Sequence, residues 1–150
     1  MNRAEPAAMN GAWIGVDVGT VRVGVARSDP SGILAIPVAT LNRDVRDNTD
    51  IAALAALVLE YEAVGVVVGL PRTLADREGT SAVMAREYAA AVSVAIGPLP
   101  VEYVDERLST VSAQRKLQQV GVRGSKAKRA VIDQAAAVEL LQHWLDSRRP

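Results

Sequence analysis

Residues 13–26 constrain the fold of this 150-residue chain more than any other stretch. An apolar run that starts at Trp13 ends on one carboxylate, Asp17, and a Gly-Thr turn leads into a second run in which valines alternate with other residues. Alternation with a period of two on both sides of a glycine turn predicts a β-hairpin. Asp17 is then expected at the end of a buried strand, where its charge is costly unless a divalent cation, a phosphate carried by a cation, or an arginine compensates it.

Downstream of the hairpin the sequence alternates between helical and strand patterns. Residues 48–50 can cap a helix whose apolar residues recur at helical spacing. The continuous valine-rich run at 64–69 is typical of a parallel strand buried on both faces. Pro37, inside the third predicted strand, indicates a sheet edge. The predicted strands are 12–17, 22–28, 33–41, 64–69 and 101–104, and the predicted helices are 51–62, 80–96, 109–120 and 126–146.

This order of elements predicts one α/β domain over residues 12–146, with flexible tails at residues 1–11 and 147–150. Three antiparallel strands come first, and right-handed crossovers then add two strands parallel to the first. A single five-stranded mixed sheet with helices on both faces buries all of these elements. The polar segments at 72–79 and 121–125 are expected to be loops.

Composition and charge narrow the class of protein. Hydrophobic residues make up 49% of the chain, which excludes a disordered protein. The absence of cysteine excludes a disulfide scaffold or a thiolate metal site and fits a cytoplasmic protein, and no stretch is long and apolar enough to cross a membrane. The net charge is zero, but residues 1–104 carry 8 basic and 12 acidic residues, whereas residues 105–150 carry 9 and 5. The basic final third is either a polyanion-binding face or a solvated helix surface.

Four acidic residues stand where this fold can bring them together. Asp17 ends the first predicted strand, Asp105 and Glu106 end the fifth, and Asp133 lies in the last predicted helix. The carboxyl ends of parallel strands meet at one edge of a sheet, which is where open α/β sheets bind their ligands. Acidic clusters without histidine or cysteine suit Mg²⁺ or Mn²⁺ rather than Zn²⁺. Paired metal ions of this kind serve phosphoryl transfer.

Each of these acidic residues also has a purely structural interpretation. Asp17 could form a turn, residues 105–107 could make a local ion pair, and Asp133 could be a helix-surface residue paired with Arg129 four positions away. The fifth strand is expected two strand spacings, about 10 Å, from the first, so the corner at 105–106 has to reach inward. The basic residues around the glycine loop before the last predicted helix have two interpretations: either they bind phosphates, or they form a solvated surface. They are Arg115, Lys116, Arg123, Lys126, Lys128 and Arg129.

Four motifs in order resemble the YqgF (RuvX) family, over residues 13–145. They are Gly15-Val16-Asp17-Val18-Gly19 with Arg22-Val23-Gly24-Val25-Ala26, then Val68-Gly69-Leu70-Pro71, Asp105-Glu106-Arg107-Leu108-Ser109-Thr110, and residues 128–141 around Asp133. The resemblance implies a ribonuclease H-like fold, related to Holliday junction resolvases, and a nuclease that matures the 5′ end of pre-16S rRNA. The chain departs from the family pattern at Val21, where lysine is common, and at Arg77, where glycine is common.

The resemblance also implies roles for individual residues. The implied catalytic residues are Asp17, Asp105, Glu106 and Asp133. Three of these, Asp17, Glu106 and Asp133, are the implied ligands of Mg²⁺ or Mn²⁺. Apart from the resemblance, the residues predicted to bind the phosphates of the substrate are Arg22, Arg107, Arg123, Lys126 and Lys128.

A metal-dependent nuclease that acts on structured RNA, such as an rRNA precursor, is the function that the sequence predicts. One alternative is a resolvase of four-way DNA junctions, which needs a homodimer with two active sites. Residues 17–20 also resemble the phosphate loop of sugar kinases and actin-like ATPases, but those proteins enclose a nucleotide between two such domains. A non-catalytic RNA-binding or ribosome-associated module is the remaining alternative.

Overall fold

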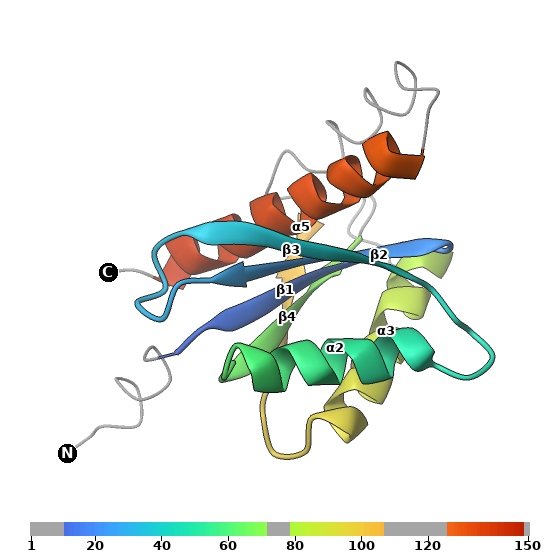
Figure 1. Ribbon diagram of the computed structural model, residues 1–150, viewed down its shortest axis with the longest axis horizontal. Helices are drawn as coiled ribbons and strands as arrows, with labels where there is room; N and C mark the ends of the chain where they lie inside the picture. Colours follow the sequence, from blue (N-terminus) through green and yellow to red (C-terminus); the bar gives the residue numbers. More distant parts are fainter. Residues whose placement is uncertain (1–10, 72–78, 107–125, 149–150) are drawn as a thin grey trace.

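The computed structural model describes residues 11–71, 79–106 and 126–148 and is built on one five-stranded sheet (Figure 1). The strand order is β3-β2-β1-β4-β5. β1 is antiparallel to β2 and β2 to β3, whereas β4 is parallel to both β1 and β5. The predicted α/β fold with a mixed sheet is thereby confirmed. The strands are β1 (Trp13–Val18), β2 (Arg22–Ser28), β3 (Ala35–Asn42), β4 (Gly65–Leu70) and β5 (Val101–Asp105).

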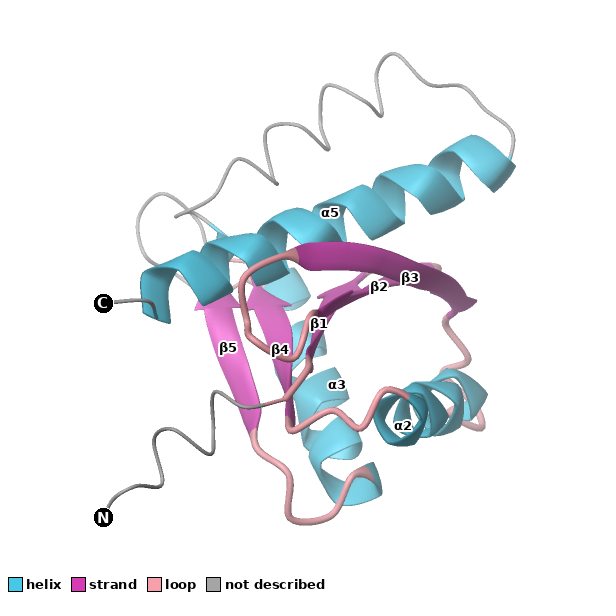
Figure 2. Cartoon of the chain, turned by 60° about the vertical axis from the view of Figure 1, so that its left-hand side comes forward, coloured by secondary structure: helices cyan, strands magenta, loops and turns pink. Residues whose placement is uncertain are grey.

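Helices cover both faces of the sheet, as predicted (Figure 2). α2 (Thr49–Glu60) and α3 (Thr80–Ala95) pack on one face, and α5 (Lys126–Arg148) lies across the other. The predicted helix at 109–120 lies outside the described residues, as do almost all of the predicted loops at 72–79 and 121–125. Among the helices that the structure describes, none combines the length and the apolar composition needed to span a membrane.

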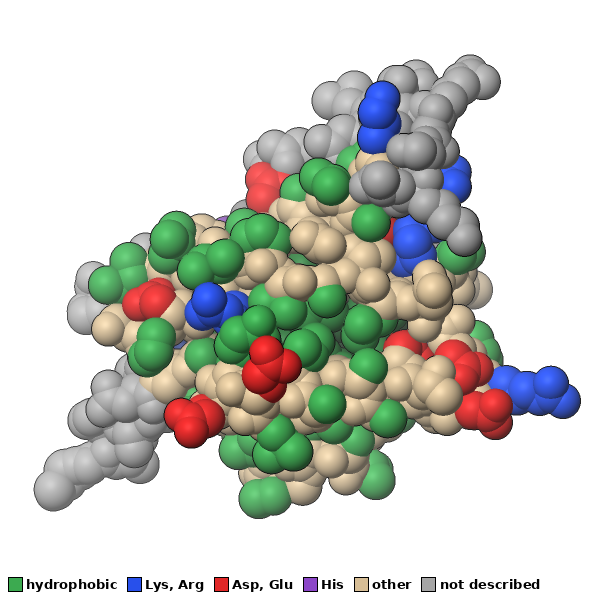
Figure 3. Space-filling view, in the orientation of Figure 1, with side chains coloured by type: hydrophobic (Ala, Val, Ile, Leu, Met, Phe, Trp, Pro, Cys, Tyr) green, Lys and Arg blue, Asp and Glu red, His purple; other side chains and the backbone are tan. Residues whose placement is uncertain are grey.

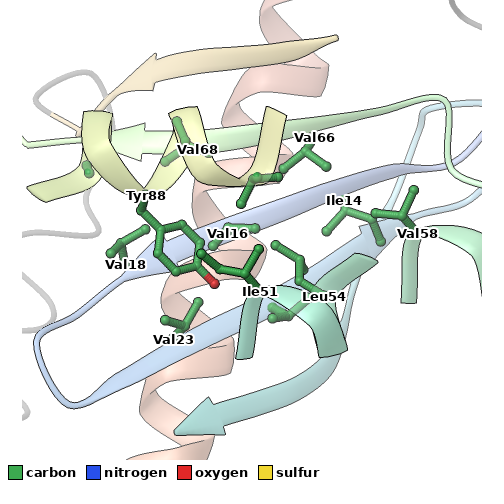
Figure 4. Packing of buried hydrophobic residues seen from close by; sticks show 14 of the residues in the cluster. Ile14, Val16, Val18, Val23, Ile51, Leu54, Val58, Val66, Val68 and Tyr88 are labelled. Carbon is green, nitrogen blue, oxygen red and sulfur yellow. The ribbon is translucent and has the colours of Figure 1, made fainter. Parts of the chain in front are cut away.

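The alternation of side chains along β1 divides the core into two layers. Ile14, Val16 and Val18 point toward α2 and α3, where they pack near Tyr88 (Figure 4). Trp13 faces α5, and its ring centroid lies 4.4 Å from that of Trp144. Because β1 is buried on both faces, its sequence is apolar at almost every position, and the one carboxylate in it is unusual.

The hairpin between β2 and β3 forms the outer edge of the sheet. Pro37 lies in β3, opposite Ala26 and next to a register shift, which confirms the predicted edge position. The Asp29 carboxylate accepts hydrogen bonds from the backbone N–H groups of Ile33 (2.8 Å) and Leu34 (2.7 Å). These bonds, that of Leu34 first, hold the pKa of Asp29 below its ordinary value.

The start of α2 differs from the predicted cap. Asn48 occupies the N-cap position, but it has a left-handed backbone (φ 54°), and its side chain makes no capping hydrogen bond. Instead its carbonyl oxygen, Oδ1, accepts a hydrogen bond from Arg43 Nη1 at 3.0 Å. Asp44 supplies the cap, because its Oδ2 accepts hydrogen bonds from both the backbone N–H (3.2 Å) and the hydroxyl (2.7 Å) of Thr49.

A buried ion pair holds the first turn of α2 against α3. Arg43 Nη1 lies 2.9 Å from Oδ1 of Asp50, whose side chain is completely buried. The Arg43 guanidinium also lies 5.0 Å from the centroid of the Tyr88 ring. Burial, and then the neighbouring Asp50 carboxylate, raise the pKa of Tyr88 above its ordinary value. This cluster faces α3, on the side of the sheet away from α5, and its role is structural.

Candidate functional site

Asp17 lies in a row of residues that crosses the sheet near the carboxyl end of β1. Asp17 is opposite Gly24 in β2, and Gly24 is opposite Thr40 in β3. On the other side, the parallel register of β1 and β4 puts Gly69 next to Asp17. Asp17 is only 4% exposed. It is therefore a buried carboxylate with a glycine on each side, on the face of the sheet that α5 covers.

The helix α5 crosses this row at Gly24. A Cβ atom on Gly24 would overlap the backbone carbonyl of Asp133, so only glycine lets the helix come this close. The hydroxyl of Thr40 donates a hydrogen bond to the carbonyl oxygen of Ala130 (2.8 Å) and accepts one from Nε2 of Gln134 (3.1 Å). These contacts fix the turn of α5 that carries Asp133 directly above the strand next to β1.

Glu106 reaches the same row from the opposite side. It directly follows β5, is 5% exposed, and its Oε2 lies 3.1 Å from the position that a Cβ on Gly69 would take. The carboxylate thus lies over β4, which is one strand away from Asp17. A glutamate side chain therefore spans one of the two strand spacings that the sequence predicted between β1 and β5.

The neighbouring acid, Asp105, belongs to the other face of the sheet. Asp105 pairs with Leu70, which packs in the layer of α2 and α3, whereas Val104 packs in the layer of α5. Because side chains alternate along a strand, Asp105 is directed away from the α5 face. Of the two acids at the corner that the sequence singled out, the structure brings only Glu106 to the face that carries Asp17.

The ion-pair partner of Asp133 is Arg22. Nε of Arg22 lies 2.6 Å from Oδ2 of Asp133, and the two side chains are 26% and 17% exposed. Arg22 is the first residue of β2, and it lies on the same face of the strand as Gly24. Helical spacing predicted Arg129 as the partner of Asp133, but Arg129 is exposed. The ion pair is made instead by Arg22, which is 111 positions away from Asp133 in the sequence.

The donor atoms at this edge fit a hard divalent cation. Asp17, Glu106 and Asp133 supply carboxylate oxygens, the ligands that Mg²⁺ and Mn²⁺ prefer over nitrogen and sulfur. In the conformation seen here, the described residues contain no three carboxylate or histidine side chains grouped closely enough to hold a metal ion. The Arg22 guanidinium, bound to Asp133, supplies the positive charge at this carboxylate instead.

The predicted substrate-binding residues are only partly covered by the structure. Arg22 pairs with Asp133, Lys128 is exposed in the first turn of α5, and Lys126 begins that helix. Arg107 and Arg123 lie outside the described residues. On the described part of the face seen in Figure 3, lysine and arginine side chains are isolated from one another rather than gathered into a patch. That part of the face therefore offers no continuous basic surface for a polyanion.

Several residues of the site were not identified from the sequence. Gly24 and Gly69 each interrupt a strand of β-branched residues, which is a signal for the close approach of another group. Thr40 and Gln134 position α5, but neither stands in a sequence pattern that distinguishes it from a solvated polar residue. Their roles depend on the distance between β3 and α5, which only the folded chain defines.

Comparison with known families gives one model that covers almost the whole chain. The model described as "RuvX: Holliday junction resolvase" matches residues 11–147. A relative from Mycolicibacterium smegmatis, named "Putative pre-16S rRNA nuclease", is 60% identical over 141 residues, which are 93% of this chain and 82% of that protein. A relative of the same name from Frankia casuarinae is 57% identical over 136 residues, 91% of this chain and 67% of that protein.

Comparison with solved structures gives similar folds at low sequence identity. RuvC from T. thermophilus in complex with a Holliday junction substrate superposes with a TM-score of 0.57 at 14% identity, over 92% of this chain and 95% of that one. Another Thermus thermophilus RuvC structure gives a TM-score of 0.51 at 10% identity, over 91% and 95% of the two chains. These similarities support the ribonuclease H-like fold.

Proposed function

The chain belongs to the RuvX family and is a nuclease, and from this premise we propose that it hydrolyses phosphodiester bonds with the help of divalent metal ions. One observation carries the proposal. Asp17 is buried between two glycines; the Glu106 carboxylate reaches over Gly69 on one side, and the turn of α5 that carries Asp133 lies over Gly24 on the other. A buried acidic site on one edge of a sheet is suited to hold a cation next to a substrate phosphate.

Asp17, Glu106 and Asp133 are the residues that would hold Mg²⁺ or Mn²⁺. When bound, a pair of such ions activates a water molecule and neutralises the charge that develops on the phosphate. Asp17 would be the shared ligand, because it lies between the other two. Asp105 would take no part, since its side chain is directed to the opposite face of the sheet.

The residues of the chain itself would bind and orient the substrate. Arg22 reaches the carboxylate site, and a guanidinium can hold a phosphate with two parallel hydrogen bonds. Arg107, Arg123, Lys126 and Lys128 come from the basic final third of the sequence and would hold phosphates outside the reacting centre.

The proposed natural substrate is the 5′ end of precursor 16S rRNA, which would place the protein in the cytoplasm. This proposal is supported by relatives at 57–60% identity that carry the name of a pre-16S rRNA nuclease. The second candidate is a four-way DNA junction, which the family description and the fold of junction-bound RuvC favour. A resolvase cuts two strands symmetrically and therefore requires a homodimer. A mass measurement with and without junction DNA separates the two candidates.

The test is a cleavage assay with a labelled pre-rRNA leader and a labelled four-way DNA junction, each with Mg²⁺, Mn²⁺ or EDTA. We expect metal-dependent cutting of the RNA by the wild type and none by Asp17→Asn. Asp47→Asn, at an exposed position in the turn before α2, is the matched control and should cut like the wild type. Cutting of the junction alone would select the resolvase, and no cutting with any metal would favour a binding module without catalysis. Circular dichroism verifies that each variant is folded.

A further inference from the structure

The contact between Arg22 and Asp133 joins two rigid parts of the fold. Two backbone hydrogen bonds flank Arg22: its carbonyl accepts the N–H of Gly19 (3.0 Å), and the carbonyl of Val21 accepts the N–H of Arg43 (2.8 Å). Asp133 lies on a helix that packs directly on β2, as Figure 2 shows for α5 and the sheet. The backbones of both partners are therefore fixed, and only the two side chains can change their contacts.

A guanidinium and a divalent cation compete for the same carboxylate. Arginine stays protonated at every accessible pH, so it cannot give up its charge when a metal ion arrives. A cation that takes the Oδ2 atom now bound to Nε of Arg22 removes the acceptor of that bond, and the repulsion between the two positive charges favours movement of the guanidinium. The cost of breaking this largely buried pair, whose side chains are 26% and 17% exposed, is offset because the cation then supplies the positive charge at Asp133.

We infer that Arg22 is an exchangeable counter-ion of Asp133, which divalent cations displace and which then binds a phosphate of the nucleic acid. This inference rests on the proposed metal site. Before the cation binds, the guanidinium neutralises Asp133 and holds its carboxylate at the start of β2. Once a cation has taken that carboxylate, the guanidinium is released beside the site, where the substrate backbone passes. Arg22 is thus a positioning residue in one state and a substrate-binding residue in the other.

Exchange of this kind couples the two ligands thermodynamically. A metal ion that frees Arg22 raises the affinity for nucleic acid, and nucleic acid raises the affinity for the metal by the same factor. The coupling belongs to binding and needs no cleavage, so it is measurable without turnover. A purely structural ion pair would leave Arg22 on Asp133 in every state, so Arg22 would contribute nothing to the coupling.

The first experiment measures Mn²⁺ binding to the full chain by calorimetry, without nucleic acid. Arg22→Ala removes the competing charge, so we expect Mn²⁺ to bind about tenfold more tightly, equivalent to about 1.4 kcal/mol. Arg22→Lys keeps the charge and should stay close to the wild type. Arg27→Ala, on the same strand but stacked on Tyr61, is the matched control and should not change the affinity. If Arg22 merely orients Asp133, Arg22→Ala will weaken Mn²⁺ binding.

The second experiment measures the affinity for a short labelled RNA duplex, with and without Ca²⁺, while a gel verifies that the strands stay intact. Without Ca²⁺, Arg22→Ala should weaken duplex binding only slightly, through the bare Asp133 charge that it leaves. With Ca²⁺, it should bind several-fold more weakly, and the slope of affinity against salt should fall by about one charge. The same loss with and without Ca²⁺ would overturn the exchange.

The two proposals fail in different ways. If the wild type binds Mn²⁺ and Asp17→Asn does not, but Arg22→Ala leaves Mn²⁺ affinity unchanged or lower, the exchange is wrong and the proposed active site stands. If the wild type binds no Mn²⁺ at all, both proposals are wrong. Tighter Mn²⁺ binding by Arg22→Ala, together with a several-fold loss of RNA affinity only in Ca²⁺, supports both.

Discussion

Alanine in place of Gly69 perturbs the site while leaving its charges unchanged. The added Cβ would lie 2.6 Å from Cδ1 of Leu140 and 3.1 Å from Oε2 of Glu106. Both neighbours are the ends of flexible side chains, so the cost in stability should be at the low end of the range for overpacking, about 1 kcal/mol. The Glu106 carboxylate, however, must retreat by a few tenths of an ångström. Since a displacement of about 1 Å costs roughly 100-fold in rate, we expect cleavage to slow by about tenfold.

Three measurements test this prediction: the cleavage rate, the Mn²⁺ affinity and unfolding in urea. Gly79→Ala is the matched control, because a Cβ at Gly79 meets no atom within 4 Å, and this variant should cleave at the wild-type rate. A Gly69→Ala variant that cleaves as fast as the wild type would refute the placement of a working Glu106 carboxylate over β4. If the Gly79→Ala control lost as much of the cleavage rate as Gly69→Ala, the cause would instead be a general effect of removing a glycine.

Three further predictions concern stability. Gly24→Ala should lower the free energy of unfolding by about 3 kcal/mol, because the backbone carbonyl of Asp133 cannot rotate aside. Urea unfolding measures this loss, and a loss below about 1 kcal/mol would contradict the close packing of α5 on β2. Asp50→Asn should cost about 3 kcal/mol in the same assay, since it leaves Arg43 beside a neutral partner, and a neutral result would contradict a buried ion pair. Asp29→Asn should be less stable than the wild type at neutral pH. The lowered pKa of Asp29 stabilises the folded state at pH values above the ordinary aspartate pKa, near 3.9, and this stabilisation is lost as the pH falls through the lowered pKa. Thermal unfolding at pH 7 and pH 3 checks this: the difference should be smaller at pH 3, and an equal difference at the two pH values would contradict it.

The parts of the fold that depend on local sequence patterns were predictable. The period of two around the Gly-Thr turn defines β1 and β2, and the range predicted for β2 agrees with the structure at both ends. The proline in β3 identified the edge strand, because a proline cannot donate a hydrogen bond to a neighbouring strand. The uncommon carboxylate in a buried strand made Asp17 a candidate from the sequence alone.

The parts that depend on register and on distant contacts were not predictable. The choice between Asp105 and Glu106 depends on which face of β5 packs against α5, and a shift of one residue reverses the answer. The pairing of Arg22 with Asp133 joins residues 111 positions apart, and no spacing rule gives it. The cap of α2 was predicted at the right place, but Asp44 supplies it, because Asn48 adopts a left-handed backbone.

The measurement that tests the central claim most directly compares Glu106→Gln with Asp105→Asn. Both variants replace one carboxylate by an amide at adjacent positions, so they differ in the face of the sheet on which the charge is lost. If Asp17, Glu106 and Asp133 form one metal site, Glu106→Gln loses both Mn²⁺ affinity and metal-dependent cleavage, whereas Asp105→Asn retains both. Loss of both properties in Asp105→Asn, with full activity in Glu106→Gln, would contradict the site.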